Sequence, residues 1–291
     1  MNNWKGTIVT LVGALMAAPA LAEDLDITRK VASDATVTVI NIAGEIGITT
    51  WDRNEVHLTG YTDANAELEI SESEQGIHFE VRQLKDKRRS GESVLNLVVP
   101  VGASIIAESV SADISVEDSR GASVSGESVS GDVEVRAQSD RIDLVSISGD
   151  LDFEGSASRS SGETVSGDID FRGISGEVSL NTVSGDAQLD AGEISSGKFE
   201  TVSGSLELSL HVGQGGRLTV ESMSGDVNLA LPSSQEGEFK AQSFSGDIRT
   251  RFGQVEHGDF GPGSHLKHVA GNNGAVIRIE SFSGDIQIGH R

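Results

Sequence analysis

The chain has 291 residues, 45 acidic against 22 basic side chains, a formal net charge of −23 and no cysteine. Without cysteine the chain has neither a disulfide nor a lipid-anchored N-terminal cysteine. The negative charge disfavours nucleic acid and anionic lipid surfaces as partners.

Residues 1–22 have the pattern of a secretory signal peptide. Lys5 gives the positive start, residues 7–18 form an apolar stretch, and Ala20, Leu21 and Ala22 supply a small-residue cleavage site. An apolar stretch of about twelve residues is too short to span a bilayer. We therefore expect an exported protein, periplasmic or secreted to the cell surface, that begins at Glu23 without a membrane span. Loss of Lys5 changes its net charge to 21 − 45 = −24.

One phrase recurs from residue 128 onward, first as Ser-Val-Ser-Gly-Asp-Val at 128–133 and last as Ser-Phe-Ser-Gly-Asp-Ile at 281–286. Its glycines are separated by 18, 18, 18, 19, 21, 21 and 38 residues. They are Gly131, Gly149, Gly167, Gly185, Gly204, Gly225, Gly246 and Gly284. A fixed period near 20 residues predicts a stacked repeat architecture with these glycines as structural positions.

Apolar residues alternate around each glycine, as in a strand with one buried face. Two residues before the glycines are Val129, Ile147, Val165, Val183, Val202, Met223, Phe244 and Phe282. Two residues after them are Val133, Leu151, Ile169, Ala187, Leu206, Val227, Ile248 and Ile286. This parity predicts that both sets face inward, and that each glycine occupies an inward slot too narrow for a side chain.

A second apolar arm precedes each glycine by five and seven residues, as Leu180 and Val178 precede Gly185. Between the arms the parity slips by one, which predicts a corner at Asn181 and Thr182 with both side chains pointing outward. Neither arm can bury its apolar face alone, so the repeats are expected to stack and share an interior. The predicted fold is all-β, a single-stranded β-solenoid (β-helix) of about ten rungs of 18–21 residues over 23–291.

Two earlier segments fit the same slots, 105–116 with Ser-Ala-Asp and 37–48 with Ala-Gly-Glu in place of Ser-Gly-Asp. The span 49–104 is then an insertion whose alternating segments predict an antiparallel β-meander capping the N-terminal end. The span 251–275, rich in Gly and His, is predicted to be a loop excursion in the last rungs.

These residues resemble a bacterial family. Ile42-Ala-Gly-Glu-Ile, the segment 50–56, Val99-Pro100 and the serial Ser-Gly-Asp rungs look like the putative-adhesin family of β-strand-repeat proteins, a domain of unknown function. The resemblance covers essentially the whole chain after residue 22. It implies an exported β-solenoid protein of the cell envelope and brings no catalytic residues.

The aspartates after the repeat glycines form the first candidate site. They are Asp113, Asp132, Asp150, Asp168, Asp186, Asp226, Asp247 and Asp285, with Ser205 interrupting the series. Stacked carboxylates repel one another unless a cation compensates them, which makes Asp150, Asp168 and Asp186 candidate ligands for a hard metal ion. The alternative is that each aspartate accepts backbone N–H bonds at its turn.

Three further features of the sequence are candidate sites or candidate core residues. His257, His265 and His268 could bind a transition metal, or be solvated in a loop. A basic run consists of Lys85, Lys87, Arg88 and Arg89. It predicts either a solvated hairpin tip or a site for self-association or docking to an anionic surface. Trp51 is predicted to lie in the core of the cap.

No nucleophile elbow, zinc-protease or phosphate-loop motif is present, so we expect no enzyme and no cofactor. The sequence favours a non-catalytic, adhesin-like scaffold that binds another envelope or surface protein. The alternative is a periplasmic stress sensor or sequestering protein that binds cationic peptides through its acidic surface.

Overall fold

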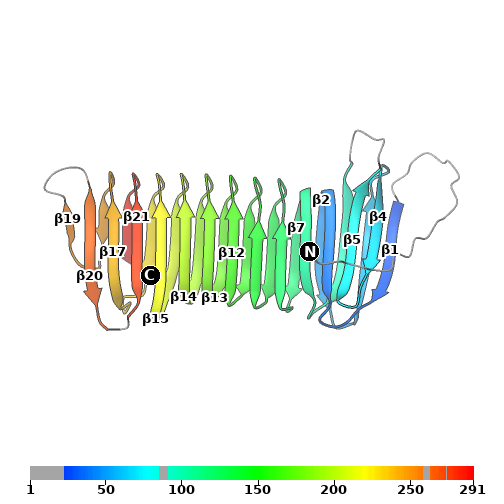
Figure 1. Ribbon diagram of the computed structural model, residues 1–291, viewed down its shortest axis with the longest axis horizontal. Helices are drawn as coiled ribbons and strands as arrows, with labels where there is room; N and C mark the ends of the chain where they lie inside the picture. Colours follow the sequence, from blue (N-terminus) through cyan, green and yellow to red (C-terminus); the bar gives the residue numbers. More distant parts are fainter. Residues whose placement is uncertain (1–22, 85–90, 258–262, 273) are drawn as a thin grey trace, which may run out of the picture. The chain divides into compact units, whose positions relative to one another are not determined.

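The computed structural model describes residues 23–291 apart from 85–90, 258–262 and 273 (Figure 1). The described residues form twenty-two strands and contain no helix. No helix of the length and apolarity needed to cross a bilayer exists among them. The chain divides into two compact units, unit 1 up to Ser139 and unit 2 from Asp140 to Arg291. The predicted signal peptide and the basic run at 85–89 lie outside the described residues.

Unit 1 contains nine strands. They are β1 (Glu23–Lys30), β2 (Thr36–Trp51), β3 (Glu55–Thr62), β4 (Ala66–Glu72), β5 (Gly76–Gln83), β6 (Ser93–Pro100), β7 (Ser104–Ser119), β8 (Ser123–Glu127) and β9 (Val133–Gln138). The long strands β2 and β7 pair in parallel, with Val37 beside Ile105 and Ile46 beside Ile114. The two early segments recognised from the repeat pattern are therefore neighbours.

The predicted meander at 49–104 is wrong. In a meander each strand pairs with the next one in an antiparallel sense, but β3 pairs with β1 and β6, and β5 and β6 both pair in parallel with β2. Only β4 and β5 form the expected antiparallel neighbours. The alternating pattern found the strands correctly but carries no information about which strands pair.

Unit 2 contains thirteen strands. They are β10 (Arg141–Val145), β11 (Leu151–Ser156), β12 (Arg159–Thr164), β13 (Ile169–Thr182), β14 (Ala187–Thr201), β15 (Leu206–Ser222), β16 (Val227–Leu231), β17 (Gly237–Ser243), β18 (Ile248–Thr250), β19 (Val255–His257), β20 (Ser264–Ala270), β21 (Val276–Ser281) and β22 (Ile286–His290). Successive repeats pair in parallel and in register, so that Leu180 lies between Gly162 and Phe199. The long strands bend, since β13 pairs with β11 through its first half and with β12 through its second.

The core of unit 2 is built from the second arm and from the apolar residues that follow each glycine. Leu180 and Val178 are buried, as are Ile169 and Phe171 after Gly167. Where a repeat carries a glycine in a core slot, a large neighbour fills the space. A Cβ on Gly162 would approach the ring of Phe171 at 3.0 Å and Leu180 at 3.1 Å. Large and small residues on neighbouring strands thus keep the packing dense.

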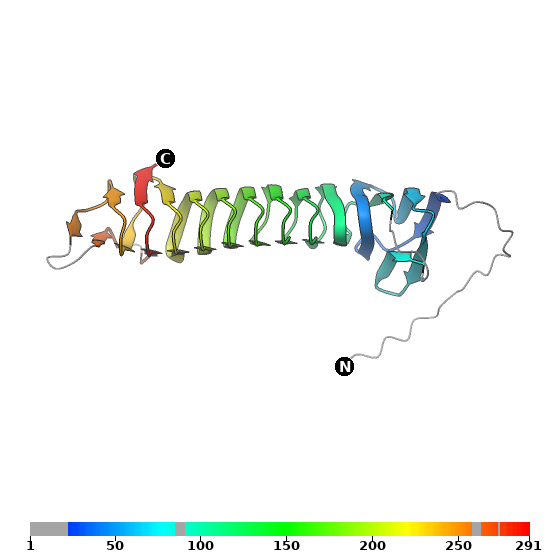
Figure 2. The same ribbon diagram turned by 90° about the horizontal axis from the view of Figure 1, so that it is seen from above.

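The C-terminal part departs from a simple stack. The predicted loop at 251–275 contains β19 and β20, and β20 pairs with β17 in an antiparallel sense. The last strands of the chain, β21 and β22, do not come next in space. They lie between β15–β16 and β17–β18, which precede them in sequence (Figures 1 and 2).

The predicted single-stranded β-solenoid of about ten rungs is therefore corrected. The fold is all-β with about 70% strand, but its parallel strands close into a seven-stranded barrel with further strands outside it. The period of the sequence gives the number of residues in a repeat. It does not show that long strands continue through a corner into a second layer, or that repeats pair out of sequence order.

Candidate binding groove

In each repeat of unit 2 the turn is closed by a hydrogen bond between a side-chain hydroxyl and a backbone N–H. The Ser or Thr three residues before the glycine is buried, and its side-chain oxygen accepts a hydrogen bond from the glycine N–H at 2.8–3.0 Å. The residues are Ser146, Thr164, Thr182, Thr201, Ser222, Ser243 and Ser281. Side chains of this kind close turns by replacing a backbone partner. At each corner the side chain that points inward is therefore that of the Ser or Thr.

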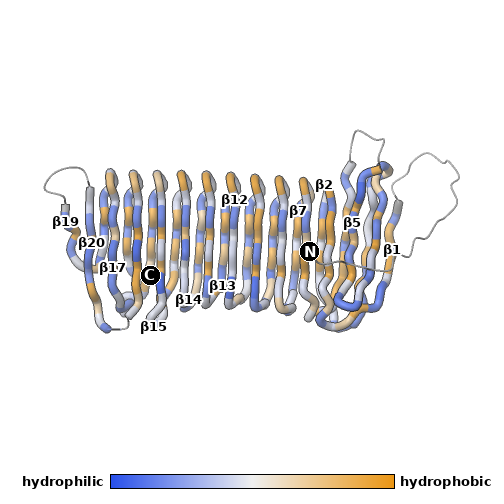
Figure 3. Tube along the Cα trace, in the orientation of Figure 1, coloured by the Kyte–Doolittle hydropathy of each residue, from blue (hydrophilic) through white to orange (hydrophobic). Residues whose placement is uncertain are grey.

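This bond turns the following apolar residue outward, against the predicted parity. The seven apolar residues two positions before the glycines of unit 2 are 41–59% exposed. In spatial order they form the apolar row: Ile147, Val165, Val183, Val202, Met223, Phe282 and Phe244. Figure 3 shows hydrophobic colour at the tips of successive turns along one edge of unit 2. In unit 1, Val110 and Val129 occupy the equivalent position and are also exposed.

Hydrogen bonds between neighbouring turns hold the apolar row in place. The N–H of Ser184 donates to the carbonyl of Val165, and the N–H of Ser203 donates to the carbonyl of Val183, both at 3.0 Å. At the end of the row the rings of Phe282 and Phe244 stack with centroids 5.1 Å apart. The spacing of the row is that of hydrogen-bonded strands, roughly 4.8 Å. The row is therefore a regular feature of the fold.

A row of glutamates runs beside the apolar row. Val145 precedes Ser146, and a polar residue precedes each of the other six hydroxyl residues. The pairing register places Glu163, Asn181, Glu200, Glu221, Glu280 and Gln242 on neighbouring strands in that order. We call these six residues the glutamate row. Lys198 donates a hydrogen bond to Glu200 at 2.7 Å. That bond raises the pKa of Lys198, and the nearby charges of Glu221 and Glu163 add to the effect.

The two rows line one open groove of about 760 Å³. Its walls are the apolar row, the glutamate row and the turn hydroxyls between them. No histidine or cysteine lines it among the described residues. The sequence contained the signal for this groove, because Ser or Thr stands three residues before every repeat glycine. The alternating pattern places the polar residues of the corner outside, and this is wrong for the buried hydroxyls, such as that of Thr182.

The aspartates that follow the repeat glycines link neighbouring turns by hydrogen bonds. The Oδ1 atom of Asp150 accepts a hydrogen bond from the N–H of Asp168 at 2.8 Å, and Asp168 does the same for Asp186 at 2.8 Å. Asp186 accepts in turn from the N–H of Ser205 at 2.7 Å. The backbone bonds proposed for these carboxylates thus run from one repeat to the next. No group of three or more potential metal ligands occurs among the residues described.

The repeat glycines are required by close backbone stacking. Seven of the eight are buried, and Gly246 is half-buried. A Cβ on Gly167, Gly185, Gly204 or Gly225 would overlap the carbonyl oxygen of the glycine in the preceding repeat. The inward slot is therefore too small for a side chain, as expected. The atom that closes it is a backbone oxygen.

His265 and His268 do not converge on one site. His265 and His268 are three residues apart on β20, and residues at that spacing point to opposite faces of a strand. His265 is exposed, whereas His268 is half-buried with its ring centroid 6.1 Å from that of Phe239. The side chain of His257 lies outside the described residues. The predicted i, i+3 pair thus gives no chelating arrangement.

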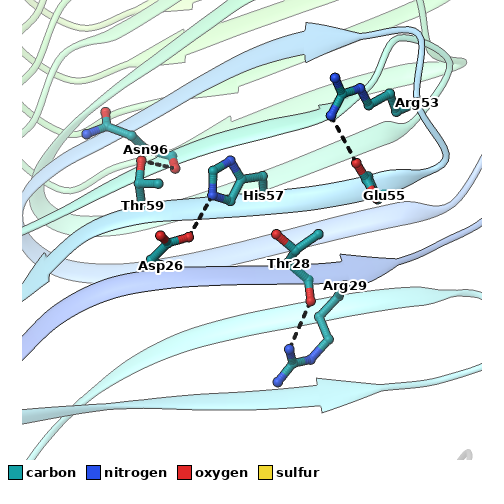
Figure 4. A network of polar contacts seen from close by, with 8 residues as sticks. All are labelled: Asp26, Thr28, Arg29, Arg53, Glu55, His57, Thr59 and Asn96. Carbon is teal, nitrogen blue, oxygen red and sulfur yellow. Dashed lines mark hydrogen bonds and ion pairs between the residues drawn. The ribbon is translucent and has the colours of Figure 1, made fainter.

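In unit 1 a cluster of polar contacts surrounds the turn that connects β2 to β3. Figure 4 shows His57 beside Asp26, with Nε2 and Oδ1 at 2.9 Å, and Arg53 near Glu55 at 3.4 Å. Trp51 is half-buried, and its Nε1 donates to the carbonyl of Glu55 at 2.8 Å. The guanidinium of Arg53 lies 4.8 Å from the centre of the Trp51 ring. Trp51 therefore stabilises the turn between β2 and β3 at the surface, and its predicted place in the core is wrong.

Comparison with known proteins identifies the family. The sequence profile of the family described as Toastrack DUF4097 matches residues 23–289. The chain belongs to this family. The match confirms the family resemblance found in the repeat motifs. A search of curated proteins finds no match.

Three solved structures are similar to the chain. A putative lipid binding protein from Parabacteroides distasonis has a TM-score of 0.47 and 13% identity, covering 91% of this chain and 96% of its own. A putative adhesin from Bacteroides fragilis has a TM-score of 0.41 and 11% identity, covering 92% and 97%. A putative cell adhesion protein from Clostridium sporogenes has a TM-score of 0.24 and 11% identity, covering 92% and 100%.

Proposed function

We propose that the protein is a non-catalytic interaction protein of the bacterial cell envelope, exported by its N-terminal segment, and that it binds its partner along the groove of unit 2. One observation carries the proposal: seven apolar side chains, each 41–59% exposed, form a continuous row on neighbouring turns. Contiguous exposed apolar surface of this kind is typical of interaction sites.

The charge of the groove favours a cationic partner. Glu163, Glu221 and Glu280 border the apolar row, and Lys198 already pairs with Glu200. A second copy of the protein laid along the same groove would place glutamate against glutamate. A polypeptide segment that carries apolar side chains flanked by lysine or arginine matches both rows. This supports the capture of cationic peptides over docking to an acidic envelope protein.

The length of the row sets the size of the bound segment. Six steps of roughly 4.8 Å give about 29 Å, which corresponds to about nine residues of an extended chain. The hydroxyls in the groove already accept the glycine N–H bonds that shape the turns. Their engagement supports a binding role for the groove over a nucleophilic one.

The test is the binding of a nine-residue peptide of alternating leucine and lysine, measured by isothermal titration calorimetry on residues 23–291. The triple variant V165S/V183S/V202S should bind much more weakly. Each valine that the bound peptide covers contributes roughly 1.5 kcal/mol, or about tenfold in affinity. Val269→Ser, at an exposed site outside the groove, is the matched control and should bind as the wild type does.

A second pair of variants separates local charge from total charge. E163Q/E221Q/E280Q removes three charges from the groove, and E193Q/E207Q/E256Q removes three exposed charges elsewhere in unit 2. Only the first should weaken binding strongly and reduce its dependence on salt, since attraction is screened within roughly 10 Å at 0.1 M salt. Equal affinities of these two variants, or full binding by the valine variant, would contradict the proposal.

A further inference from the structure

The last two strands of the chain occupy a position that the preceding strands leave free. The second half of β15 pairs with β21, and β21 pairs on its other side with β17. In the second layer β16 pairs with β22, and β22 pairs with β18. The space between these four elements is one strand wide in each layer, and we call it the C-terminal slot. In Figure 1 the red strand β21 lies between the yellow β15 and the orange β17.

Residues 276–290 form hydrogen bonds to the strands on both sides of the slot, and their isoleucine side chains are buried in the core. Ile277, Ile279, Ile286 and Ile288 are at most 1% exposed. At the turn, the N–H of Phe282 donates to the carbonyl of Ser222, and the N–H of Phe244 donates to the carbonyl of Ser281, both at 3.0 Å. Residues 276–290 are thus bound as an inserted ligand would be bound.

The aspartate bonds pass through the inserted segment in the same way. The N–H of Asp285 donates to Asp226 Oδ1 at 2.8 Å, and the N–H of Asp247 donates to Asp285 Oδ1 at 2.9 Å. All these partners lie 38 or more residues away in sequence. Nothing in these contacts requires the segment and the slot to belong to the same chain.

The order of insertion leaves the slot open during folding. β17 and β18 precede β21 and β22 in the chain, yet they join β15 and β16 only through β21 and β22. Until residues 276–290 enter, the edges of β15 and β17 lack their partner strand. Unpaired strand edges readily accept a strand from another molecule.

The turn sequence does not discriminate between the inserted repeat and the repeat of β17 and β18 beside it. Ser243–Ile248 and Ser281–Ile286 are the same hexapeptide, Ser-Phe-Ser-Gly-Asp-Ile. Specific recognition of the inserted segment comes from outside this hexapeptide. Arg291, for example, donates through its N–H to the carbonyl of Leu231 and through its guanidinium to the carbonyl of Ala191, both at 3.0 Å.

We propose that the C-terminal slot is a binding site for residues 276–290 of a second copy, and that two molecules exchange these segments reciprocally. Exchange of an identical element replaces each contact by the same contact, so it costs little beyond the association itself. The exchange requires the segment to leave its own slot. It should therefore be slow under native conditions and accelerate near the unfolding midpoint.

The test uses full-length chains with single cysteines, since the protein has none. Ser245 and Ser283 are exposed and lie on adjacent turns, next to the stacked rings of Phe244 and Phe282. Chains carrying Ser245→Cys, labelled with ¹⁵N, are mixed with unlabelled chains carrying Ser283→Cys. The mixture is held near the unfolding midpoint, returned to native conditions and oxidised. Mass spectrometry should then find a labelled-to-unlabelled disulfide between positions 245 and 283.

Ser166→Cys mixed with Ser184→Cys is the matched control, because these turns are also adjacent but belong to repeats stacked in sequence order. We expect a severalfold excess of the 245–283 interchain disulfide over the 166–184 one. The double variant S245C/S283C should form its disulfide within a monomer without the incubation, which verifies that the positions are adjacent. Equal yields in the two mixtures, or no 245–283 interchain product, would overturn the exchange.

Discussion

The side-chain Oγ1 of Thr182 accepts a hydrogen bond from the N–H of Gly185 at 3.0 Å, and this bond directs Val183 to the solvent. The same relationship recurs in the other repeats of unit 2. One buried hydroxyl per repeat thus creates the corner, satisfies the glycine N–H and exposes one apolar residue. The groove is a direct product of the turn that builds the fold.

Thr182→Ala should therefore lower the free energy of unfolding by about 1–3 kcal/mol, because it leaves the N–H of Gly185 buried without a partner. Thr182→Ser keeps the hydroxyl and should lose much less. Urea denaturation of both variants measures the difference. If alanine and serine are equally destabilising, the methyl group of Thr182 rather than its hydroxyl is what matters.

Gly185→Ala should destabilise unit 2 by about 1–3 kcal/mol or more, since its Cβ would overlap the carbonyl oxygen of Gly167. Gly192→Ala is the control, because a Cβ there would meet only the carbonyl oxygen of Ile174 at 3.7 Å. The control should be neutral or slightly stabilising. Thermal melts of the two variants decide the matter, and similar melting temperatures would argue against the close stacking of the glycines.

Leu180→Ala should cost about 2–5 kcal/mol, as expected for a leucine that is fully buried. Val183→Ala, three residues later, should cost less than about 1 kcal/mol because that side chain is 41% exposed. Denaturation midpoints in urea compare them directly. A large loss at Val183 would place the apolar row inside the fold and remove the basis for the groove.

Asp168→Ala should lower the free energy of unfolding by about 0.5–1.5 kcal/mol, because the N–H of Asp186 loses its acceptor. Asp168→Asn retains an oxygen at the same place and should stay closer to the wild type. Calcium should leave the melting temperature of the wild type unchanged if the carboxylate serves the backbone alone. A calcium-dependent stabilisation of the wild type that Asp168→Asn abolishes would show a metal role instead.

Asp63 in unit 1 offers a test by pH. Backbone N–H groups of Gly91 and Asn65 lower the pKa of Asp63 below its usual value of 3.8. A depressed folded-state pKa adds stability that is complete above 3.8 and is lost as the pH falls through the lower value. The stability difference between wild type and Asp63→Asn should therefore shrink on acidification below pH 3.8. A difference independent of pH would contradict this account.

The sequence by itself determined the repeat, the strands and most of the core. Period-two alternation places Leu180 and Ile169 inside because successive side chains of a strand point to opposite faces. It also determined that Gly185 tolerates no side chain. The direction of Val183 was within reach as well, since Thr182 stands three residues before Gly185. Alternation alone assigns a valine between polar residues to the interior. The hydrogen bond from the glycine N–H to the preceding hydroxyl reverses that assignment.

Only the tertiary structure decided which strands pair. Residues 276–290 contain the same apolar pattern as every other repeat, so the pattern fits any position in the stack equally well. Their place between β15 and β17 depends on connection lengths and on contacts between residues far apart, such as Arg291 with Ala191. The barrel closure and the groove depend in the same way on neighbours in space. A local period specifies a repeat, whereas hydrogen bonds between repeats specify their order.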